Sequence, residues 1–302
     1  MKKIILIVMI VALSFTLWGK VDSNAGEYGF QMLKISSGPI EGALGGTGIY
    51  NHNNAFSYLG NASSTSVNNS QLLECGKNMW LFDTNFTNIS YINSLGKNGF
   101  GVGVRYLDYG KIDSYDETNV QVGVIQPLDV DMIVNYSRRI SANHFVGINS
   151  HILYEELDSS SDLGSAFDLG YTYLPPISGM TFNLALKYFG KTGKMDKETI
   201  KLPLTEQAGI SQKFEFNELS LLSELNLLKH KDDDNIKANL GFDLGFRKML
   251  HLRFGYRINY DLETFSLGMG IKVKKIMINY AYLPIQENLD DVNMISLTYK
   301  FK

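Results

Sequence analysis

The chain has 302 residues, a formal net charge of −3 and a hydrophobic content of 44%. This charge balance excludes a broad basic surface for nucleic acid. The mean hydropathy is −0.08, and no stretch after the N-terminus is apolar enough for a membrane helix. These numbers do not exclude a membrane β-barrel, because the strands of such a barrel alternate apolar and polar residues.

The N-terminus has the pattern of a secretory signal. Lys2 and Lys3 form a charged start, and an apolar stretch from Ile4 to Trp18 follows. Small residues then precede the expected cleavage position. We therefore predict that residues 1–25 are a signal peptide, with cleavage after Gly19 as the alternative.

Residues 26–70 form an N-terminal segment before the first predicted strand. Four glycines fall within seven residues, at Gly42, Gly45, Gly46 and Gly48. One interpretation is a flexible periplasmic lead-in. The other is a plug that folds into the barrel mouth, where the absence of side chains permits close packing.

Residues 71–302 carry a two-residue alternation of apolar and polar side chains, which is most regular over residues 237–273. Alternate residues of a strand point to opposite faces, so each segment has one apolar and one polar face. Each segment runs about 10 residues, long enough to cross a bilayer at a tilt, whereas strands of a soluble sandwich average about 5–6. We predict an all-β, transmembrane, antiparallel barrel of about 14 strands. The predicted strands are residues 71–77, 84–95, 99–108, 129–139, 144–154, 164–173, 180–189, 205–216, 219–228, 237–246, 249–259, 264–273, 275–283 and 293–301.

The lengths of the predicted connections also alternate. Every second turn is short, and the connections between them are mostly longer. Outer-membrane barrels have short periplasmic turns and longer extracellular loops, so an even strand count places both chain ends in the periplasm. The predicted long loops are residues 109–128, 155–163, 190–204, 229–236 and 284–292.

The alternation assigns a set of charged residues to the barrel interior. A charge on the lipid face near the midplane would cost about 2–4 kcal/mol, so these side chains should face inward. Their mixed signs are typical of a salt-bridged or plugged interior. The predicted lumen-facing charges are Arg105, Asp168, Lys187, Asp243, Arg253, Arg257 and Lys272.

No motif indicates an enzyme, a cofactor or a metal site. The glycine-rich run at residues 99–104 has the period of a strand and precedes no helix, so it is not a dinucleotide-binding loop. The five histidines lack paired-ligand spacing. The acidic run from His230 to Asp234 has no turn glycine of a calcium loop. Cys75 is the single cysteine, so no internal disulfide forms.

Several short runs, in order along the first two thirds of the chain, resemble the PorV/PorQ family of outer-membrane proteins. Gly60 to Ala62 stand where that family has Asn-Pro-Ala, and lack the proline. The matching runs are Gly29 to Ile35, Gly38, Gly42 to Gly46, Tyr106 to Gly110, Tyr136 to Arg138 and Ala166 to Tyr171.

The resemblance implies an outer-membrane barrel related to FadL-like channels. It also implies a non-enzymatic role in protein transport by the type IX secretion system, or in surface attachment, through the extracellular loops. The expected partners are outer-membrane lipid and secretion-system subunits or exported proteins. The alternative is a FadL-like passive channel for hydrophobic or small substrates, with residues 26–70 as its plug. An outer-membrane enzyme is the least favoured interpretation.

Overall fold

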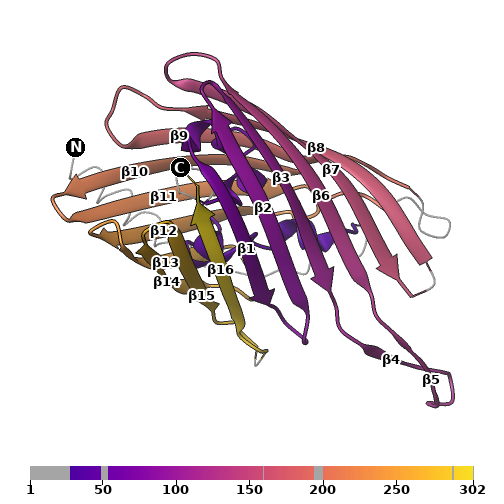
Figure 1. The fold of residues 1–302 in the computed structure, drawn as a ribbon. Coiled ribbons are helices and arrows are strands. Elements are labelled where there is room, and N and C mark those ends of the chain that lie inside the picture. The colour runs from indigo at the N-terminus through magenta and orange to yellow at the C-terminus, as the bar shows by residue number, and fades with distance from the viewer. Residues whose placement is uncertain (1–27, 49–53, 159, 194–199, 288, 302) are drawn as a thin grey trace.

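The computed structural model describes residues 28–48, 54–158, 160–193, 200–287 and 289–301. The predicted signal peptide lies outside the described residues. Among the described residues, fourteen antiparallel strands close into one barrel, which confirms the predicted fold (Figure 1). The ladder closes where β1 pairs with β16. The barrel strands are β1 (Gln71–Met79), β2 (Asn85–Leu95), β3 (Asn98–Asp108), β6 (Leu128–Arg139), β7 (His144–Leu157), β8 (Ser160–Tyr173), β9 (Met180–Thr192), β10 (Thr205–Phe216), β11 (Leu219–His230), β12 (Ile236–Phe246), β13 (Leu250–Ile258), β14 (Phe265–Val273), β15 (Ile276–Leu283) and β16 (Val292–Lys300).

The alternation in the sequence becomes the two faces of this wall. Phe100, Val102 and Val104 of β3 are about half exposed on the outside, while Arg105 of the same strand is 1% exposed on the inside. Closure leaves no unpaired sheet edge, which is a condition for a strand protein to cross hydrocarbon. An apolar exterior on a closed barrel therefore makes this an outer-membrane barrel.

Short turns join the strands at one end of the barrel. The turns at Gly96, Asn217 and Lys274 begin with a residue whose φ is positive, between 47° and 64°. This backbone twist matches the twist of paired strands in tight hairpins. We take this end as periplasmic, because outer-membrane barrels place their short turns there.

The opposite end differs from the prediction in two places. Residues 155–163, predicted as a loop, mostly continue β7 and β8, because Glu155 and Asp162 are buried on the inner face rather than exposed in a loop. The loop predicted at 109–128 contains a two-stranded hairpin, β4 (Ile112–Tyr115) and β5 (Gln121–Ile125), which projects from the barrel end (Figure 1).

Short helices fill the barrel interior in Figure 1. We call the described residues 28–48 and 54–70 the plug. The plug contains η1 (Gln31–Lys34), α2 (Pro39–Ala43), α3 (Ser57–Gly60) and α4 (Ser64–Asn68). Its side chains form the centre of buried clusters with the wall, such as Tyr58 and Leu59 with Ile133. Among the described residues, no helix is long and apolar enough to cross a membrane.

Candidate functional site: the plugged lumen

Glycines on the inner wall mark where the plug backbone touches the barrel. A Cβ atom added at Gly170 of β8 would lie 2.6 Å from the Ala62 nitrogen. One added at Gly99 of β3 would lie 2.7 Å from the Ser66 nitrogen. Because no side chain fits at either position, this part of the wall and the plug meet backbone to backbone.

Polar side chains on the same part of the wall bind the irregular backbone of the plug. The Asn135 side-chain amide donates to the Ala62 carbonyl at 2.8 Å, and the Asn149 amide donates to the Tyr58 carbonyl at 2.9 Å. In the other direction, the Ser66 backbone N–H donates to the Ser137 hydroxyl at 2.8 Å. These bonds satisfy plug backbone groups that would otherwise be buried without partners.

A chain of charged groups runs along the inner wall over four adjacent strands, beside α3. Arg105 of β3 pairs with Asp131 of β6, with 2.9 Å between Nε and Oδ2. His151 of β7 bridges Asp131 and Asp168 of β8, with 3.0 Å at each ring nitrogen. All four side chains are at most 2% exposed. Removing one member would leave a buried charge without compensation.

A β-bulge interrupts the wall next to this chain of charges. Asp168 of β8 lies opposite two residues of β9, Lys187 and Tyr188, and the register shifts between Phe167 and Leu169. The Tyr188 backbone N–H donates to Asp168 Oδ1 at 2.7 Å, and its hydroxyl donates to the Leu33 carbonyl of the plug at 2.7 Å. The bulge thereby turns an aromatic side chain inward onto the plug.

The ladder between β9 and β10 ends at this bulge. Lys187 pairs with Thr205, and in the described part of the chain residues 188–192 of β9 have no ladder partner in β10. The residues just before β10 contact the plug. There the Gly29 backbone N–H donates to the Lys201 carbonyl at 3.2 Å. We call this place the wall break.

Two hollows lie on either side of the wall below the break. The lipid-facing groove, about 600 Å³, is bordered by outward leucines such as Leu169, Leu184 and Leu227. The extracellular pocket, about 230 Å³, lies in the lumen above the plug. Gln207 and Leu228 border both hollows, so a single layer of wall separates lipid from lumen at this point.

The extracellular pocket is polar. Arg257 pairs with Glu263 at 2.8 Å, and Lys34 of the plug pairs with Asp232 at 2.6 Å. Tyr260, in the loop after β13, also borders the pocket, and burial raises the pKa of its phenol to about 12. The phenol therefore stays protonated and can donate a hydrogen bond at neutral pH.

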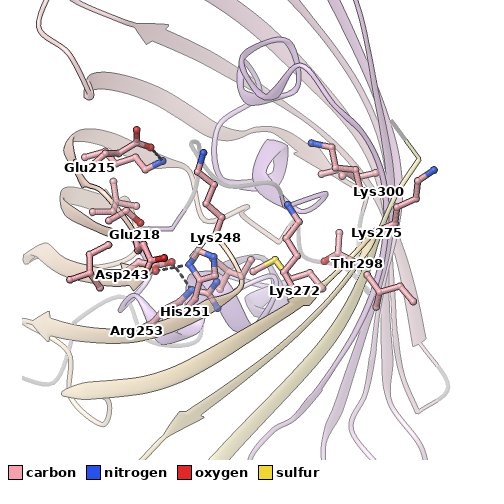
Figure 2. Close-up of a pocket in the computed structure, with 18 of the residues that line it drawn as sticks. Glu215, Glu218, Asp243, Lys248, His251, Arg253, Lys272, Lys275, Thr298 and Lys300 are labelled. Atoms are coloured by element: carbon pink, nitrogen blue, oxygen red, sulfur yellow. Dashed lines mark hydrogen bonds and ion pairs between the residues drawn. The ribbon is translucent and has the colours of Figure 1, made fainter. Parts of the chain in front are cut away.

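A third hollow, the periplasmic pocket of about 400 Å³, lies below the plug among the ends of β10 to β16 (Figure 2). Ile40 of α2 and Leu72 of β1 contribute apolar lining. Asp243 accepts from the ring of His251 at 2.8 Å and from Arg253 Nε at 2.9 Å. Most of the remaining charged lining consists of lysines.

The structure places all seven predicted lumen charges along the interior, but not at one site. Arg105 and Asp168 belong to the buried chain of charges, and Lys187 lies at the bulge. Arg257 borders the extracellular pocket. The other three, Asp243, Arg253 and Lys272, border the periplasmic pocket.

Three of the four predicted plug glycines, Gly42, Gly45 and Gly46, lie against the opposite side of the barrel. Gly42 packs on Met294, and a Cβ atom there would lie 2.6 Å from its sulfur. Gly45 and Gly46 have φ values of 67° and 86°, a region that favours glycine. Gly48 packs against Ile40 and Leu44 of the plug itself.

Sequence reasoning missed three carboxylates that face one another at the extracellular end. Asp129, Glu155 and Asp162 are directly opposite in the β6–β7–β8 ladder and are at most 6% exposed. The Phe30 backbone N–H donates to Glu155 Oε1 at 3.3 Å, and the Tyr109 hydroxyl donates to Asp129 Oδ2 at 2.9 Å. Continued alternation beyond residue 154 was the signal that could have revealed them. In the described ranges, no cluster of His, Cys, Asp or Glu is arranged to hold a metal ion.

Comparison with known proteins supports the fold alone. No family model and no curated protein matches the sequence. The Pseudomonas putida toluene transporter TodX is 12% identical, with a TM-score of 0.63 over 87% of this chain and 97% of that one. The CymD monoaromatic hydrocarbon channel is also 12% identical, with a TM-score of 0.63 over 88% and 97%. A Pseudomonas aeruginosa FadL homologue is 11% identical, with a TM-score of 0.54 over 88% and 98%. The chain thus has the fold of FadL-like outer-membrane barrels, and the resemblance to PorV/PorQ proteins receives no support from these comparisons.

Proposed function

We propose that the protein is a plugged, passive outer-membrane channel for small molecules with an apolar part, which pass through the wall break. The observation that carries this proposal is the alignment of two hollows across one layer of wall. The lipid-facing groove lies outside Gln207 and Leu228, and the extracellular pocket lies inside them. Ligand sites are usually concave, mostly apolar and bordered by a few polar groups.

The structural neighbours include proteins described as a toluene transporter and a monoaromatic hydrocarbon channel. Here the extracellular pocket is bordered by Lys187, Lys237 and Arg257 as well as by apolar side chains. Charged groups would have to lose water to make room for a pure hydrocarbon, which is costly. This lining favours a small molecule that combines an apolar body with a polar group.

Passage to the periplasm requires a shift of the plug, because α2 and the following glycines separate the extracellular pocket from the periplasmic pocket. Ile40 borders the periplasmic pocket, and Glu41 and Gly46 border the extracellular one. Short elements with few anchors are the segments that open at low free-energy cost. The Ser266 hydroxyl donates to the Ala43 carbonyl of α2 at 3.0 Å. More wall side chains bond to α3, α4 and the residues between them, so the route follows α2.

Deleting Lys187 tests the proposal. The deletion removes the extra residue of the bulge and leaves Tyr188 opposite Asp168 in regular alternation, which should close the wall break. The matched control is Lys187→Met, which removes the charge but keeps the bulge. We expect cells that carry the deletion variant to take up radiolabelled benzyl alcohol about tenfold more slowly, while the control keeps the parental rate. Undiminished uptake by a folded, heat-modifiable deletion variant would contradict the proposal.

A role in protein secretion or surface attachment is a second proposal, and the projecting hairpin is the observation that favours it. Val120, Val122 and Val124 of this hairpin are 57%, 62% and 53% exposed. An isolated two-stranded hairpin is only marginally stable in water, and exposed apolar side chains indicate contact sites. We expect crosslinking in native membranes to recover exported proteins or secretion subunits. Replacement of residues 112–125 by a Gly-Ser linker should abolish that recovery. Recovery of no such protein with the full chain would rule the role out.

A further inference from the structure

The periplasmic pocket is strongly cationic. Its lining includes Lys213, Lys248, Arg253, Lys272, Lys275 and Lys300 against Glu215, Glu218 and Asp243. Six cations against three carboxylates give the lining a net charge of +3 at neutral pH, with His251 counted as neutral. The whole chain carries −3, so the positive charge is concentrated here.

The carboxylates of the pocket already have partners. Glu215 pairs with Lys213 at 2.9 Å, and Glu218 pairs with Arg247 at 2.9 Å. Asp243 is held by Arg253. Among the described residues, Lys248 and Lys272 have no carboxylate within ion-pair distance. The surplus charge of the pocket therefore resides mainly on lysine ammonium groups.

Three of these ammonium groups are directed at one space. The register places Lys272 of β14 opposite Met277 of β15, and Met277 opposite Thr298 of β16, so Lys300 lies on the same inner face two residues on. Lys248 reaches the same space from the turn after β12. Figure 2 shows the ends of Lys248, Lys272 and Lys300 turned toward this space, while Lys275 points away and donates to the Phe301 carbonyl at 3.0 Å.

We propose that the periplasmic pocket is a binding site for a small anion that carries phosphate or carboxylate oxygens, held by Lys248, Lys272 and Lys300. Like charges brought together at a cavity repel one another, and a bound anion removes that repulsion. A cleft lined by one sign of charge between low-dielectric walls also concentrates the opposite ion. Lysine ammonium groups are compact charges that suit phosphate oxygens. The inference does not depend on what crosses the barrel, because the site opens to the periplasmic end.

The test is a calorimetric titration of inorganic phosphate into the purified full-length mature barrel in an uncharged detergent. We expect saturable binding that weakens as salt rises, since the screening length falls from about 10 Å at 0.1 M to about 3 Å at 1 M. The variant Lys272→Gln/Lys300→Gln should weaken binding about tenfold, equivalent to about 1.4 kcal/mol. The control Lys97→Gln/Lys111→Gln removes the same charge from exposed positions outside the pocket and should bind as the parent does.

Nanodiscs of different lipid composition distinguish a lipid head group from a soluble anion as the ligand of the site. If phosphate binds the parent protein more weakly in phosphatidylglycerol discs than in phosphatidylcholine discs, a lipid head group occupies the site. If the lipid makes no difference, the site takes a soluble periplasmic anion. Absence of saturable binding, or equal binding by the parent and the Lys272→Gln/Lys300→Gln variant, would overturn the proposal.

Discussion

The two sides of the barrel hold the plug in different ways. Along β2, β3 and β6 to β8, α4 lies against the wall, and inward asparagines donate to plug carbonyls. Along β13 to β16, the plug makes contact through α2. The strands that border the described hollows are β8 to β16, together with Leu72 of β1. The first side acts as a seal because its polar groups form hydrogen bonds with the plug. The second side keeps polar groups facing open space, where a solute or an anion can meet them.

The largest expected effect on stability comes from removing one charge of the buried chain of charges on the sealed side. Arg105→Met leaves Asp131 buried with only His151 as a charged partner, and removal of one member of a buried pair costs about 3–5 kcal/mol. Denaturant unfolding in detergent, followed by the loss of heat-modifiable migration, measures this change. The control is Arg247→Met, whose ion pair with Glu218 is more than half exposed and contributes about 1 kcal/mol or less. Equal losses in the two variants would show that the buried chain of charges does not hold the seal.

A smaller effect is expected from crowding the seal. Gly170→Val introduces side-chain atoms where the Ala62 and Ser63 backbone nitrogens already lie within 2.7 Å of an added Cβ. Overpacking of this kind costs about 1–3 kcal/mol. Gly123→Val, on β5 where nothing lies within 4 Å, is the matched control and should unfold at the parental denaturant concentration. A Gly170→Val variant as stable as the control would mean that the plug does not press on this wall.

The smallest effect has the opposite sign. Asp129→Asn removes one of three directly opposed carboxylates and keeps an oxygen for the Tyr109 hydroxyl. Like charges directly opposite one another in a ladder destabilise it, so we expect a gain of about 0.5–1 kcal/mol at pH 8. The exposed Asp113→Asn on β4 serves as the control and should leave stability unchanged. Destabilisation by Asp129→Asn would show that the three carboxylates do not repel one another in the folded barrel.

The strands of the wall could be predicted from the sequence, because the face to which a side chain points depends only on whether its position in the strand is odd or even. Over residues 237–273 the alternation is regular, and the observed strands β12, β13 and β14 cover Ile236–Phe246, Leu250–Ile258 and Phe265–Val273. A shift of one residue would place every apolar side chain of such a strand in the lumen. Charged residues such as Arg253 and Lys272 could be assigned to the interior for the same reason.

The site could not be predicted in full, because it depends on contacts between distant segments. The Tyr188 hydroxyl meets the Leu33 carbonyl 155 residues away, and no local pattern specifies that pair. The bulge at Asp168 adds one residue on the β9 side of the ladder. A single extra residue is too small a change to be recognised from the apolar–polar alternation of the sequence. Glu155 and Asp162 were interpreted as loop residues because they are polar, although they belong to inward positions of continuing strands.

One side of the lumen is sealed and the other is open, and labelling of single cysteines with a thiol reagent distinguishes the two sides. In a Cys75→Ser background, Ser137→Cys lies on the sealed side, where Ser137 is 0% exposed and accepts from the plug. Ser220→Cys borders the periplasmic pocket. A water-soluble maleimide added to permeabilised cells should label the cysteine at position 220 and leave the one at position 137 unmodified. Equal labelling of both positions would show that the wall around Ser137 is as open to water as the periplasmic pocket.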